Sequence, residues 1–259
     1  MNLLEIENLT VDFETRSGLF RAVDRVSLTV APREIVSIVG ESGSGKSTLL
    51  SLLSGQLAPT AGSVAYRMRD GSIRDLVSLG EAERRHLFRT DWGFVHQDAA
   101  KGLRMGVSAG GNVGERLMAV GARHYGDIRA RAEDWLERVE IDVERIDEKP
   151  TAYSGGMRQR LQIARNLVTA PRLVFMDEPT GGLDVSVQAR LLDLLRRLVA
   201  DMGLAVIVVT HDLAVARLLS DRIMVMRQGR VIEAGLTDRV LDDPREAYTQ
   251  LLVSSILQP

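Results

Sequence analysis

The chain of 259 residues contains no cysteine and no strong excess of charge of either sign. The lack of cysteine excludes disulfides, iron–sulfur ligation and thiol catalysis, and it fits a reducing compartment, so we expect a cytoplasmic location. The formal net charge is −2, which gives the whole chain no attraction to nucleic acid or to an anionic membrane. We therefore expect no nucleic-acid partner and no chemistry that depends on a thiol.

Long hydrophobic runs are also missing. The longest apolar segments, such as residues 204–209, are far shorter than the roughly 20 residues that span a bilayer. The first seven residues alternate like a strand, and no basic region precedes a long apolar stretch, so we expect no signal peptide. Direct membrane insertion is therefore not expected, and any membrane partner would have to supply its own span.

A glycine-rich segment follows the strand-like residues 35–39. Residues 40–47 read Gly-Glu-Ser-Gly-Ser-Gly-Lys-Ser, which is the complete P-loop pattern. The glycines let successive N–H groups point into one concavity, and a helix that begins near Lys46 adds the positive end of its dipole. We expect Lys46 to bridge the β- and γ-phosphates of a nucleoside triphosphate and Ser47 to bind Mg²⁺. The predicted nucleotide-binding residues of this segment are Gly40, Glu41, Ser42, Gly43, Ser44, Gly45, Lys46, Ser47 and Thr48.

Two carboxylates, Asp177 and Glu178, offer the metal partner and the catalytic group that a P-loop ATPase requires. Residues 173–178 read Leu-Val-Phe-Met-Asp-Glu, a buried strand of the Walker B type. By itself the P-loop pattern could be a connecting loop, and a lone Asp-Glu pair is more often a solvated strand end, but each pattern strengthens the other. Asp177 is expected to complete the Mg²⁺ shell through water, and Glu178 to orient and polarise the attacking water. The two patterns together predict hydrolysis of a nucleoside triphosphate.

The pattern of apolar residues predicts an α/β fold. Residues 1–34 and 62–79 read as strands with turns and indicate an antiparallel layer. A parallel sheet covered by helices is predicted where short apolar strands alternate with helical segments, in residues 35–61, 90–97 and 172–233. Residues 98–168 lack β-branched runs and have helical periodicity, so they are predicted to form a largely helical insert.

A second anion-binding pattern ends the predicted insert. Residues 153–160 read Tyr-Ser-Gly-Gly-Met-Arg-Gln-Arg and lead into a helix, so a capping Ser154 and the following glycines offer a hydroxyl and N–H groups to an anion. In isolation this would be an ordinary capped helix start. Here it lies just before the Walker B strand, and this order of motifs resembles that of the ATP-binding cassette (ABC) proteins. The signature sequence of that family is usually Leu-Ser-Gly-Gly-Gln. Tyr153 and Met157 depart from that signature, whereas Ser154, Gly155 and Gly156, which face phosphate in the family, are retained.

The resemblance implies roles for further residues. Gln97 matches the Q-loop glutamine that touches Mg²⁺ and the lytic water, and His211 matches the switch histidine that contacts the γ-phosphate. Asp184 matches the D-loop residue that communicates between sites, although Gly182 replaces the usual alanine. Phe13 is the expected platform for adenine, and Phe20 is the less favoured choice. The cofactors implied are ATP and Mg²⁺.

The family also implies an architecture. We expect a P-loop NTPase of the ABC type that forms a single nucleotide-binding domain over residues 1–259. In it, residues 1–97 and 169–259 would form an antiparallel β-subdomain and a RecA-like parallel-sheet core, and residues 98–168 a helical signature subdomain. In the family, the signature loop of one subunit closes over ATP bound by another, so an ATP-dependent, head-to-tail homodimer is implied. Ser154 and Gly156 would then act in trans.

Two subfamilies compete for the partner. The P-loop segment 39–47, the segment 177–189 and the tail with Asp243-Pro244 and residues 248–252 look like the oligopeptide and dipeptide importer ATPases. A different set of stretches closely resembles the ATP-binding K subunits of bacterial phosphonate carbon–phosphorus lyase systems, namely residues 103–118, 121–129, 147–150 and 253–255. We favour the second subfamily, which implies docking on soluble lyase core subunits and a role in organophosphonate catabolism. An importer subunit is the alternative. A soluble ATPase of DNA repair or translation is a third class, but the chain has no long coiled coil, second cassette or basic stripe.

Basic residues follow the predicted Q-loop. Lys101, Arg104, Arg116 and Arg123 make this segment basic, with few bulky apolar residues among them. They could form a docking surface for the partner or the solvated face of an exposed helix, and the sequence favours neither interpretation.

Overall fold

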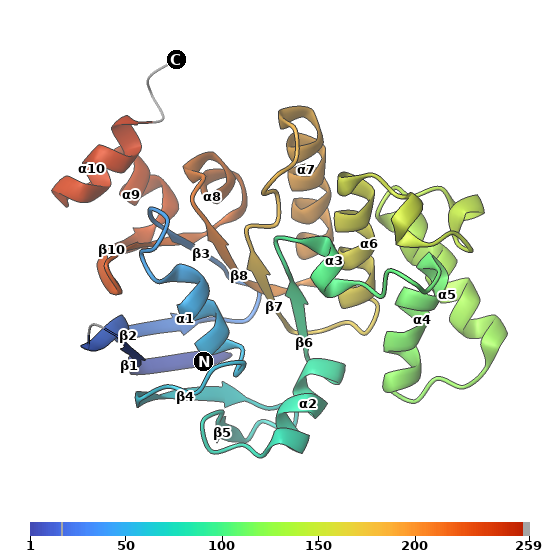
Figure 1. The fold of residues 1–259 in the computed structure, drawn as a ribbon, viewed down its shortest axis with the longest axis horizontal. Helices are drawn as coiled ribbons and strands as arrows, with labels where there is room; N and C mark the ends of the chain where they lie inside the picture. The colour runs from blue at the N-terminus through green and yellow to red at the C-terminus, as the bar shows by residue number, and fades with distance from the viewer. Residues whose placement is uncertain (17, 256–259) are drawn as a thin grey trace. The chain divides into compact units, whose positions relative to one another are not determined.

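The computed structural model describes residues 1–16 and 18–255 (Figure 1). The chain forms two compact units. The first unit comprises Met1–Arg84 and Ala205–Pro259, and the second unit comprises Arg85–Leu204. Helix α2 (Glu81–Thr90) contains the boundary between them.

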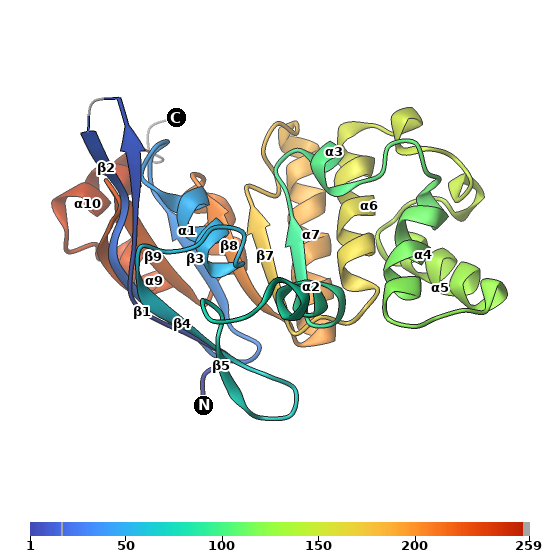
Figure 2. The same ribbon diagram turned by 60° about the horizontal axis from the view of Figure 1, so that its bottom comes forward.

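An antiparallel sheet forms one part of the first unit. Its strands are β1 (Leu4–Thr15), β2 (Gly18–Val30), β4 (Ala61–Arg67) and β5 (Ile73–Asp75), in the order β2-β1-β4-β5. Figure 2 shows β1, β2 and β4 side by side. Apolar and polar residues alternate at the start of β1, as expected of a strand with one buried face, because Leu4 and Ile6 are buried while Glu5 is exposed. The antiparallel layer predicted from the sequence is confirmed.

A second group of strands in the first unit carries the P-loop. Strand β3 (Ile35–Val39) pairs in parallel with both β8 (Ala205–Thr210) and β9 (Arg222–Arg227). Strand β8 is buried along its whole length, as expected of a parallel strand covered on both faces. Strand β10 (Arg230–Leu236) returns antiparallel to β9 after Gln228 and Gly229, whose φ angles are 49° and 78°. Two successive left-handed residues are typical of a tight hairpin turn. The turn reverses the chain, so β10 runs antiparallel to β9, whereas β3, β8 and β9 pair in parallel.

The described part of the first unit also contains four whole helices. They are α1 (Lys46–Leu53), α8 (Leu213–Leu219), α9 (Thr237–Asp242) and α10 (Ala247–Ser254). The last three helices contribute to one apolar cluster that also includes Val39 and Val225 from the strands. Val39, which directly precedes the P-loop, is part of this cluster.

The second unit combines two parallel strands with helices. Strand β6 (Trp92–Val95) pairs with β7 (Leu173–Asp177). The helices are α3 (Ala99–Gly102), α4 (Ala109–Ala119), α5 (Tyr125–Arg138), α6 (Gly155–Leu167) and α7 (Val185–Met202), with 3₁₀ turns η1 (Val143–Arg145) and η2 (Pro150–Ala152). Residues 98–168 contain no strand, so the predicted helical character of this segment is confirmed.

Apolar side chains hold the second unit together. Fully buried Trp92 meets Phe88 and Phe175 edge to face, with ring centroids 5.4 and 5.5 Å apart. Helix α7 is amphipathic, with a leucine-rich buried face. No helix in the described part of the chain is both long enough and apolar enough to span a bilayer.

Candidate functional site

The P-loop of the first unit connects β3 to α1 and lies directly against neighbouring backbone. A Cβ added at Gly40, where φ is 151°, would collide with the carbonyl oxygen of Met226. A Cβ at Gly45, where φ is 100°, would lie 2.5 Å from the carbonyl oxygen of Ala22. Both positions therefore require glycine for the backbone angle and for space.

Lys46 is placed to receive an anion. Its side chain is 6% exposed, and Nζ donates to the carbonyl oxygens of Gly40 and Glu41, each at 2.8 Å. A phosphate would offer charged acceptors instead of these neutral carbonyls, and charge-assisted hydrogen bonds are the stronger kind. Lys46 could therefore exchange these carbonyl oxygens for a phosphate.

The two aromatic candidates for adenine lie opposite each other. Phe13 on β1 pairs directly with Phe20 on β2, and the side chains are 38% and 55% exposed. Directly paired residues of an antiparallel sheet point to the same face. The structure thus brings Phe13 and Phe20 together as one exposed aromatic pair.

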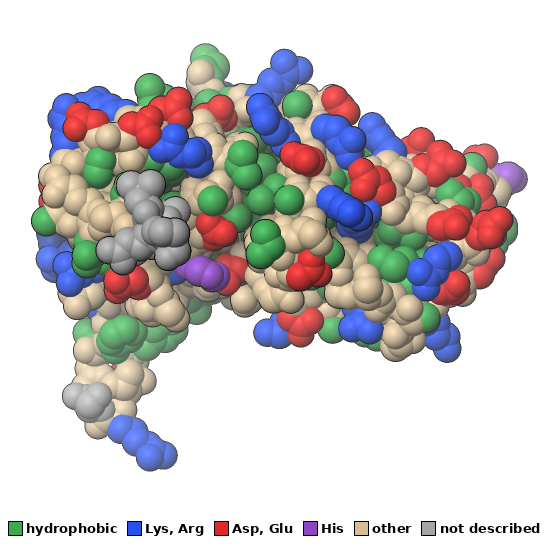
Figure 3. Space-filling view, turned by 90° about the horizontal axis from the view of Figure 1, so that it is seen from above, with side chains coloured by type: hydrophobic (Ala, Val, Ile, Leu, Met, Phe, Trp, Pro, Cys, Tyr) green, Lys and Arg blue, Asp and Glu red, His purple; other side chains and the backbone are tan. Residues whose placement is uncertain are grey.

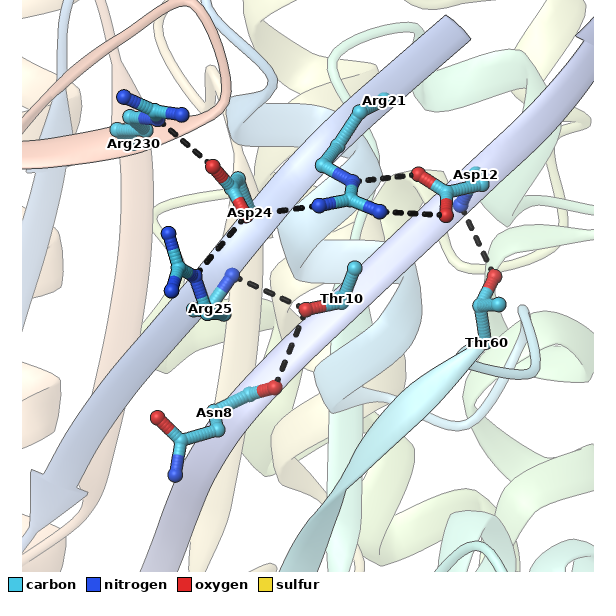
Figure 4. Close-up of polar contacts among 8 residues, drawn as sticks. All are labelled: Asn8, Thr10, Asp12, Arg21, Asp24, Arg25, Thr60 and Arg230. Carbon is cyan, nitrogen blue, oxygen red and sulfur yellow. Dashed lines mark hydrogen bonds and ion pairs between the residues drawn. The ribbon is translucent and has the colours of Figure 1, made fainter. Parts of the chain in front are cut away.

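A cluster of charges fixes the strands that carry these aromatic residues (Figure 4). Arg21 binds Asp12 through two hydrogen bonds of 2.8 and 3.0 Å. Arg21 also contacts Asp24 at 3.3 Å, and Arg230 of β10 donates to Asp24 at 2.7 Å. The cluster therefore joins β1, β2 and β10.

The pKa values of the two aspartates reflect this cluster. The hydrogen bonds and charge of Arg21 lower the pKa of Asp12. Burial of Asp24, whose side chain is 5% exposed, opposes ionisation, but Arg230, Arg25 and Arg21 together lower its pKa overall. Both carboxylates are thus held ionised by the neighbouring guanidinium groups.

His211 completes the predicted residues of the first unit. It follows β8 at an exposed position, immediately before Asp212, whose side chain accepts hydrogen bonds from Ala214 and Val215 at the start of α8. The first unit thus holds Phe13, residues 40–48 and His211. The second unit holds the other predicted site residues, which are Gln97, Ser154, Gly155, Gly156, Asp177, Glu178 and Asp184.

The second unit brings Gln97 and Glu178 into contact. Gln97 Nε2 donates to Glu178 Oε2 at 3.0 Å. Glu178 follows the Walker B strand with a φ of 42°, an angle that few non-glycine residues adopt. A Cβ added at Gly181 would lie 3.0 Å from Gln97 Nε2 and 3.2 Å from its Cγ, so glycine at this position makes room for the glutamine. Asp177 is half-buried at the end of β7.

The signature residues begin helix α6. Ser154 is the N-cap, and its Oγ accepts a hydrogen bond from the N–H of Met157 at 3.3 Å. A Cβ at Gly156 would lie 2.6 Å from Val187 Cγ1, so glycine lets α6 approach α7 closely. This contact gives Gly156 a packing reason that is separate from any contact with phosphate.

Asp184 caps helix α7. Its Oδ1 accepts from Ser186 Oγ at 2.7 Å and from the N–H of Val187 at 3.0 Å, and these bonds lower its pKa. A hollow of about 330 Å³ lies between the Q-loop, the start of α6 and the D-loop. Its lining includes Gln97, Gly155, Arg158, Gly181, Gly182 and Leu183.

Two functional candidates were missed in the sequence. Gln162 Oε1 accepts from the N–H of His96 at 2.7 Å, while Nε2 of both Gln162 and Gln159 donates to the His96 carbonyl oxygen. Both glutamines are nearly fully buried on α6. The only sequence signal was a pair of polar residues three apart on the face that the helical pattern assigns to the core. Burial is the main cause that lowers the pKa of His96 itself.

Oxygen donors suited to Mg²⁺ are present, but they form no preassembled carboxylate cage. Throughout residues 1–16 and 18–255, no three His, Asp or Glu side chains are grouped so as to hold a metal. Each of the predicted ligands Ser47, Gln97 and Asp177 has a side-chain oxygen, and oxygen is the donor that Mg²⁺ prefers. This donor set fits an ion that takes the rest of its shell from phosphate and water.

Arg116 does not belong to an exposed basic face. Its Nη2 donates to the carbonyl oxygens of Phe88 and Trp92, at 2.6 and 3.2 Å. Burial, and secondarily the charge of Arg165, lowers the pKa of Arg116 to about 10. Its position explains the difference from expectation, because residue 116 lies on α4 next to the buried residue Leu117.

Comparison with known proteins identifies the family. The ABC transporter family model matches residues 23–181. The chain is 63% identical over 256 residues to PhnK of Escherichia coli (strain K12), which is named as a phosphonates utilization ATP-binding protein, and the match covers 99% of this chain and 98% of that protein. It is 40% identical to BAB2_1052 of Brucella abortus (strain 2308), which is named as a peptide import ATP-binding protein, over 98% of this chain and 77% of that protein.

A solved structure agrees with these relatives. The ATP-binding cassette MJ0796, in a dimeric post-hydrolysis state bound to ADP and Pi, superposes with a TM-score of 0.80 and 32% identity. The match covers 90% of this chain and 98% of that chain. The expected α/β fold of the P-loop class is thereby confirmed, and the chain belongs to the ABC transporter family as an ATP-binding cassette ATPase.

Proposed function

We propose that this chain hydrolyses Mg-ATP as a head-to-tail homodimer and that the resulting motion drives a phosphonate carbon–phosphorus lyase complex in organophosphonate catabolism. The observation that carries the proposal is the 63% identity to the phosphonates utilization protein over nearly the whole length of both chains. In this proposal, residues 1–259 form one nucleotide-binding domain. Residues 98–168 are its signature subdomain, and residues 1–97 and 169–259 are its β-subdomain and core.

Each site residue has a proposed role in the reaction. Lys46 and the P-loop N–H groups bind the phosphates, and Phe13 stacks on adenine. Ser47, Gln97 and Asp177 would hold Mg²⁺, which when bound would neutralise charge on the phosphates. The contact of 3.0 Å between Gln97 and Glu178 supports a shared task for these two side chains, in which Glu178 polarises a water held by Gln97.

His211 is proposed to contact the γ-phosphate, and the remaining residues act across the dimer. Ser154, Gly155 and Gly156 would close over ATP bound by a second copy, with Asp184 linking the two sites. The start of α6 supports this role, since Ser154 and Gly155 are exposed and Gly155 lines the hollow beside the Q-loop. The dimeric state of the cassette MJ0796 supports association of two copies. ATP would then close the dimer, and hydrolysis would remove the γ-phosphate bridge and reopen it.

The partner surface is proposed to follow the Q-loop. Lys101, Arg104 and Arg123 are exposed, whereas Arg116 faces inward and leaves this set. Arg104 is partly neutralised by Glu115, with Nε and Oε1 3.1 Å apart. On the face drawn in Figure 3, positive and negative side chains are interspersed. Lys101 and Arg123 are therefore the residues to test.

A peptide importer remains the second candidate. The 40% identity to the peptide import protein of Brucella abortus favours it, together with the shared P-loop and tail motifs. The two functions predict different partners, because an importer subunit docks on a membrane permease. A lyase subunit docks on a soluble complex.

Purification of the tagged chain from cells grown on a phosphonate as the phosphorus source tests the proposal. We expect co-purification with soluble lyase subunits, and loss of both co-purification and growth in the double variant Lys101→Glu, Arg123→Glu. Its ATPase activity should persist, and its association should weaken with salt, since exposed charges are screened within about 8–10 Å at physiological ionic strength. The matched control is Arg239→Glu on α9, an exposed arginine far along the chain from the segment. Recovery with a permease in the membrane fraction, unaffected by the double variant, would promote the importer.

A further inference from the structure

The tail of the chain contains a motif to which the proposed function gives no role. Residues 243–252 form the short connection that follows α9 and most of α10. The only aromatic residue of this stretch, Tyr248, is 7% exposed. Its side chain points away from solvent and toward the P-loop.

Tyr248 makes a hydrogen bond to the P-loop backbone. Its hydroxyl accepts from the N–H of Glu41 at 3.2 Å, although the two residues are 207 positions apart. Glu41 directly follows Gly40, whose positive φ begins the loop. The tail therefore contacts the P-loop at the point where the chain leaves β3.

The ring of Tyr248 is fixed on two sides. It packs in the apolar cluster with Val39, Val225 and Val240. The guanidinium carbon of Arg227 lies 4.7 Å from the ring centroid, in a cation–π contact. Because packing already orders the ring, the hydrogen bond to Glu41 costs no further side-chain entropy.

The helix that carries Tyr248 is itself anchored to β10. The carboxylate of Glu233 accepts from the N–H groups of Arg245 at 3.0 Å and Glu246 at 3.2 Å, just before α10 begins. Gln250 Nε2 donates back to the carbonyl oxygen of Pro244 at 3.0 Å. Helix α10 is thus a fixed support and not a free end.

The backbone of Glu41 is held on both sides of its Cα. Its carbonyl oxygen accepts from Lys46 Nζ at 2.8 Å and from the N–H of Ser44 at 3.2 Å, while its N–H donates to Tyr248. Lys46 has to turn from this carbonyl to a phosphate when nucleotide binds. The bond from Tyr248 does not depend on Lys46, so it can persist in both states.

We infer that Tyr248 is a positioning residue for nucleotide binding, which holds the first peptide of the P-loop in place while Lys46 exchanges a backbone carbonyl for phosphate. A glycine-rich loop loses more conformational entropy on ordering than other loops, so a fixed point outside the loop lowers the cost of binding. The inference rests on the proposed phosphate-binding role of residues 40–47. It adds the tail of the chain to the nucleotide site.

The variant Tyr248→Phe tests the inference, because it keeps the ring and removes only the hydroxyl that accepts from Glu41. We expect the Kd for a fluorescent ATP analogue and for ADP to rise about two- to tenfold, the range for the loss of one hydrogen bond. The KM for ATP should rise by the same factor with kcat nearly unchanged, since the variant leaves the residues at the γ-phosphate intact. The thermal unfolding midpoint without nucleotide should stay within about 2 °C of wild type, since the packing is retained.

Two further variants separate positioning from general effects. Tyr125→Phe removes a hydroxyl from a 72% exposed tyrosine of the second unit and should leave nucleotide affinity unchanged. Arg227→Met should weaken affinity in the same direction as Tyr248→Phe, but less. Because Arg227 acts through the orientation of the hydroxyl, adding Arg227→Met to Tyr248→Phe should cause no further loss.

The outcomes distinguish the inference from the proposed function. If the wild-type chain binds no nucleotide, the phosphate-binding role of the P-loop fails. If it binds nucleotide and Tyr248→Phe binds equally well, the positioning role is overturned while the P-loop role stands. A weaker affinity that comes with a large fall in the unfolding midpoint would also overturn it, because the tyrosine would then act only through stability.

Discussion

Gln97 donates a hydrogen bond to the carboxylate of Glu178, with Nε2 and Oε2 3.0 Å apart. The proposed base thus has as its partner a residue that the family resemblance also assigns to Mg²⁺ and water. Glu178 sits at a positive φ of 42°, a conformation that costs on the order of 1 kcal/mol and persists only where the surroundings impose it. The pairing therefore identifies a small group of atoms on which turnover should depend.

Replacing Glu178 by glutamine should remove most turnover and preserve ATP binding. Glu178→Gln keeps the shape of the side chain but deletes the group proposed to polarise water, so we expect kcat to fall by about 10²- to 10⁴-fold. ATP-dependent dimerisation, measured by light scattering, should persist. Near-normal hydrolysis would place the base elsewhere, with His211 the next residue to test.

A methyl group at position 181 should disturb the same pair. The Cβ of Gly181→Ala would lie 3.0 Å from Gln97 Nε2, so the glutamine has to move and its bond to Glu178 lengthens. We expect kcat to fall several-fold with little change in nucleotide affinity. Gly106→Ala, where an added Cβ meets nothing within 4 Å, is the control. Equal kcat values for the two variants would show that the contact is dispensable.

Mixing two inactive chains should restore one site if the dimer is head to tail. In a heterodimer of Lys46→Ala and Ser154→Arg chains, both defects fall on one composite site and the other site is intact. We expect ATP-dependent closure of the mixture, and no closure when both changes are in one chain. A mixture that never closes would contradict the proposed arrangement.

Arg116 should matter for stability. Arg116→Met leaves the carbonyl oxygens of Phe88 and Trp92 without their shared donor, which should cost about 1–3 kcal/mol in the free energy of unfolding. Arg104→Met removes an exposed ion pair and should cost less than about 1 kcal/mol. Urea unfolding of the two variants measures the difference, and similar losses would argue against the inward position of Arg116.

Low pH should reduce the stability of the first unit, because Asp12 and Asp24 lose their charge. The pKa values of Asp12 and Asp24 are lower in the folded chain than in the unfolded chain, so their contribution to stability is present above the unfolded value of about 4. It is lost as the pH falls through the lower folded values. Asp24→Asn should therefore be less stable than wild type between about pH 5 and 7. The difference between the two chains in free energy of unfolding should decrease below about pH 4. A difference in free energy of unfolding that does not change with pH would contradict this account.

Features encoded within short segments could be predicted from the sequence. The P-loop between β3 and α1 depends on glycines whose angles and spacing are local, and the helical character of residues 98–168 follows from periodicity. Contacts between distant segments could not be predicted. The bond from Tyr248 to Glu41 spans 207 positions, and no local pattern marks a tyrosine as a partner of a loop so far away.

Orientation on a helix was the other source of error. Arg116 was grouped with Lys101 and Arg104 because of charge, whereas its direction is decided by packing. It lies three residues after buried Val113 and adjacent to buried Leu117, so the helical period places it at the edge of the core. A long guanidinium side chain can cross that edge and reach backbone carbonyls.

The two glutamines of α6 have a mechanical consequence for the second unit. Gln162 accepts from the N–H of His96, and Gln159 and Gln162 both donate to its carbonyl oxygen, so the backbone of His96 is bonded to the signature helix on both sides of its Cα. The next residue along the chain is Gln97. In the proposed dimer, any rotation of α6 on contact with a second subunit would move the Q-loop with it, and the contact would then affect the side chain that donates to Glu178.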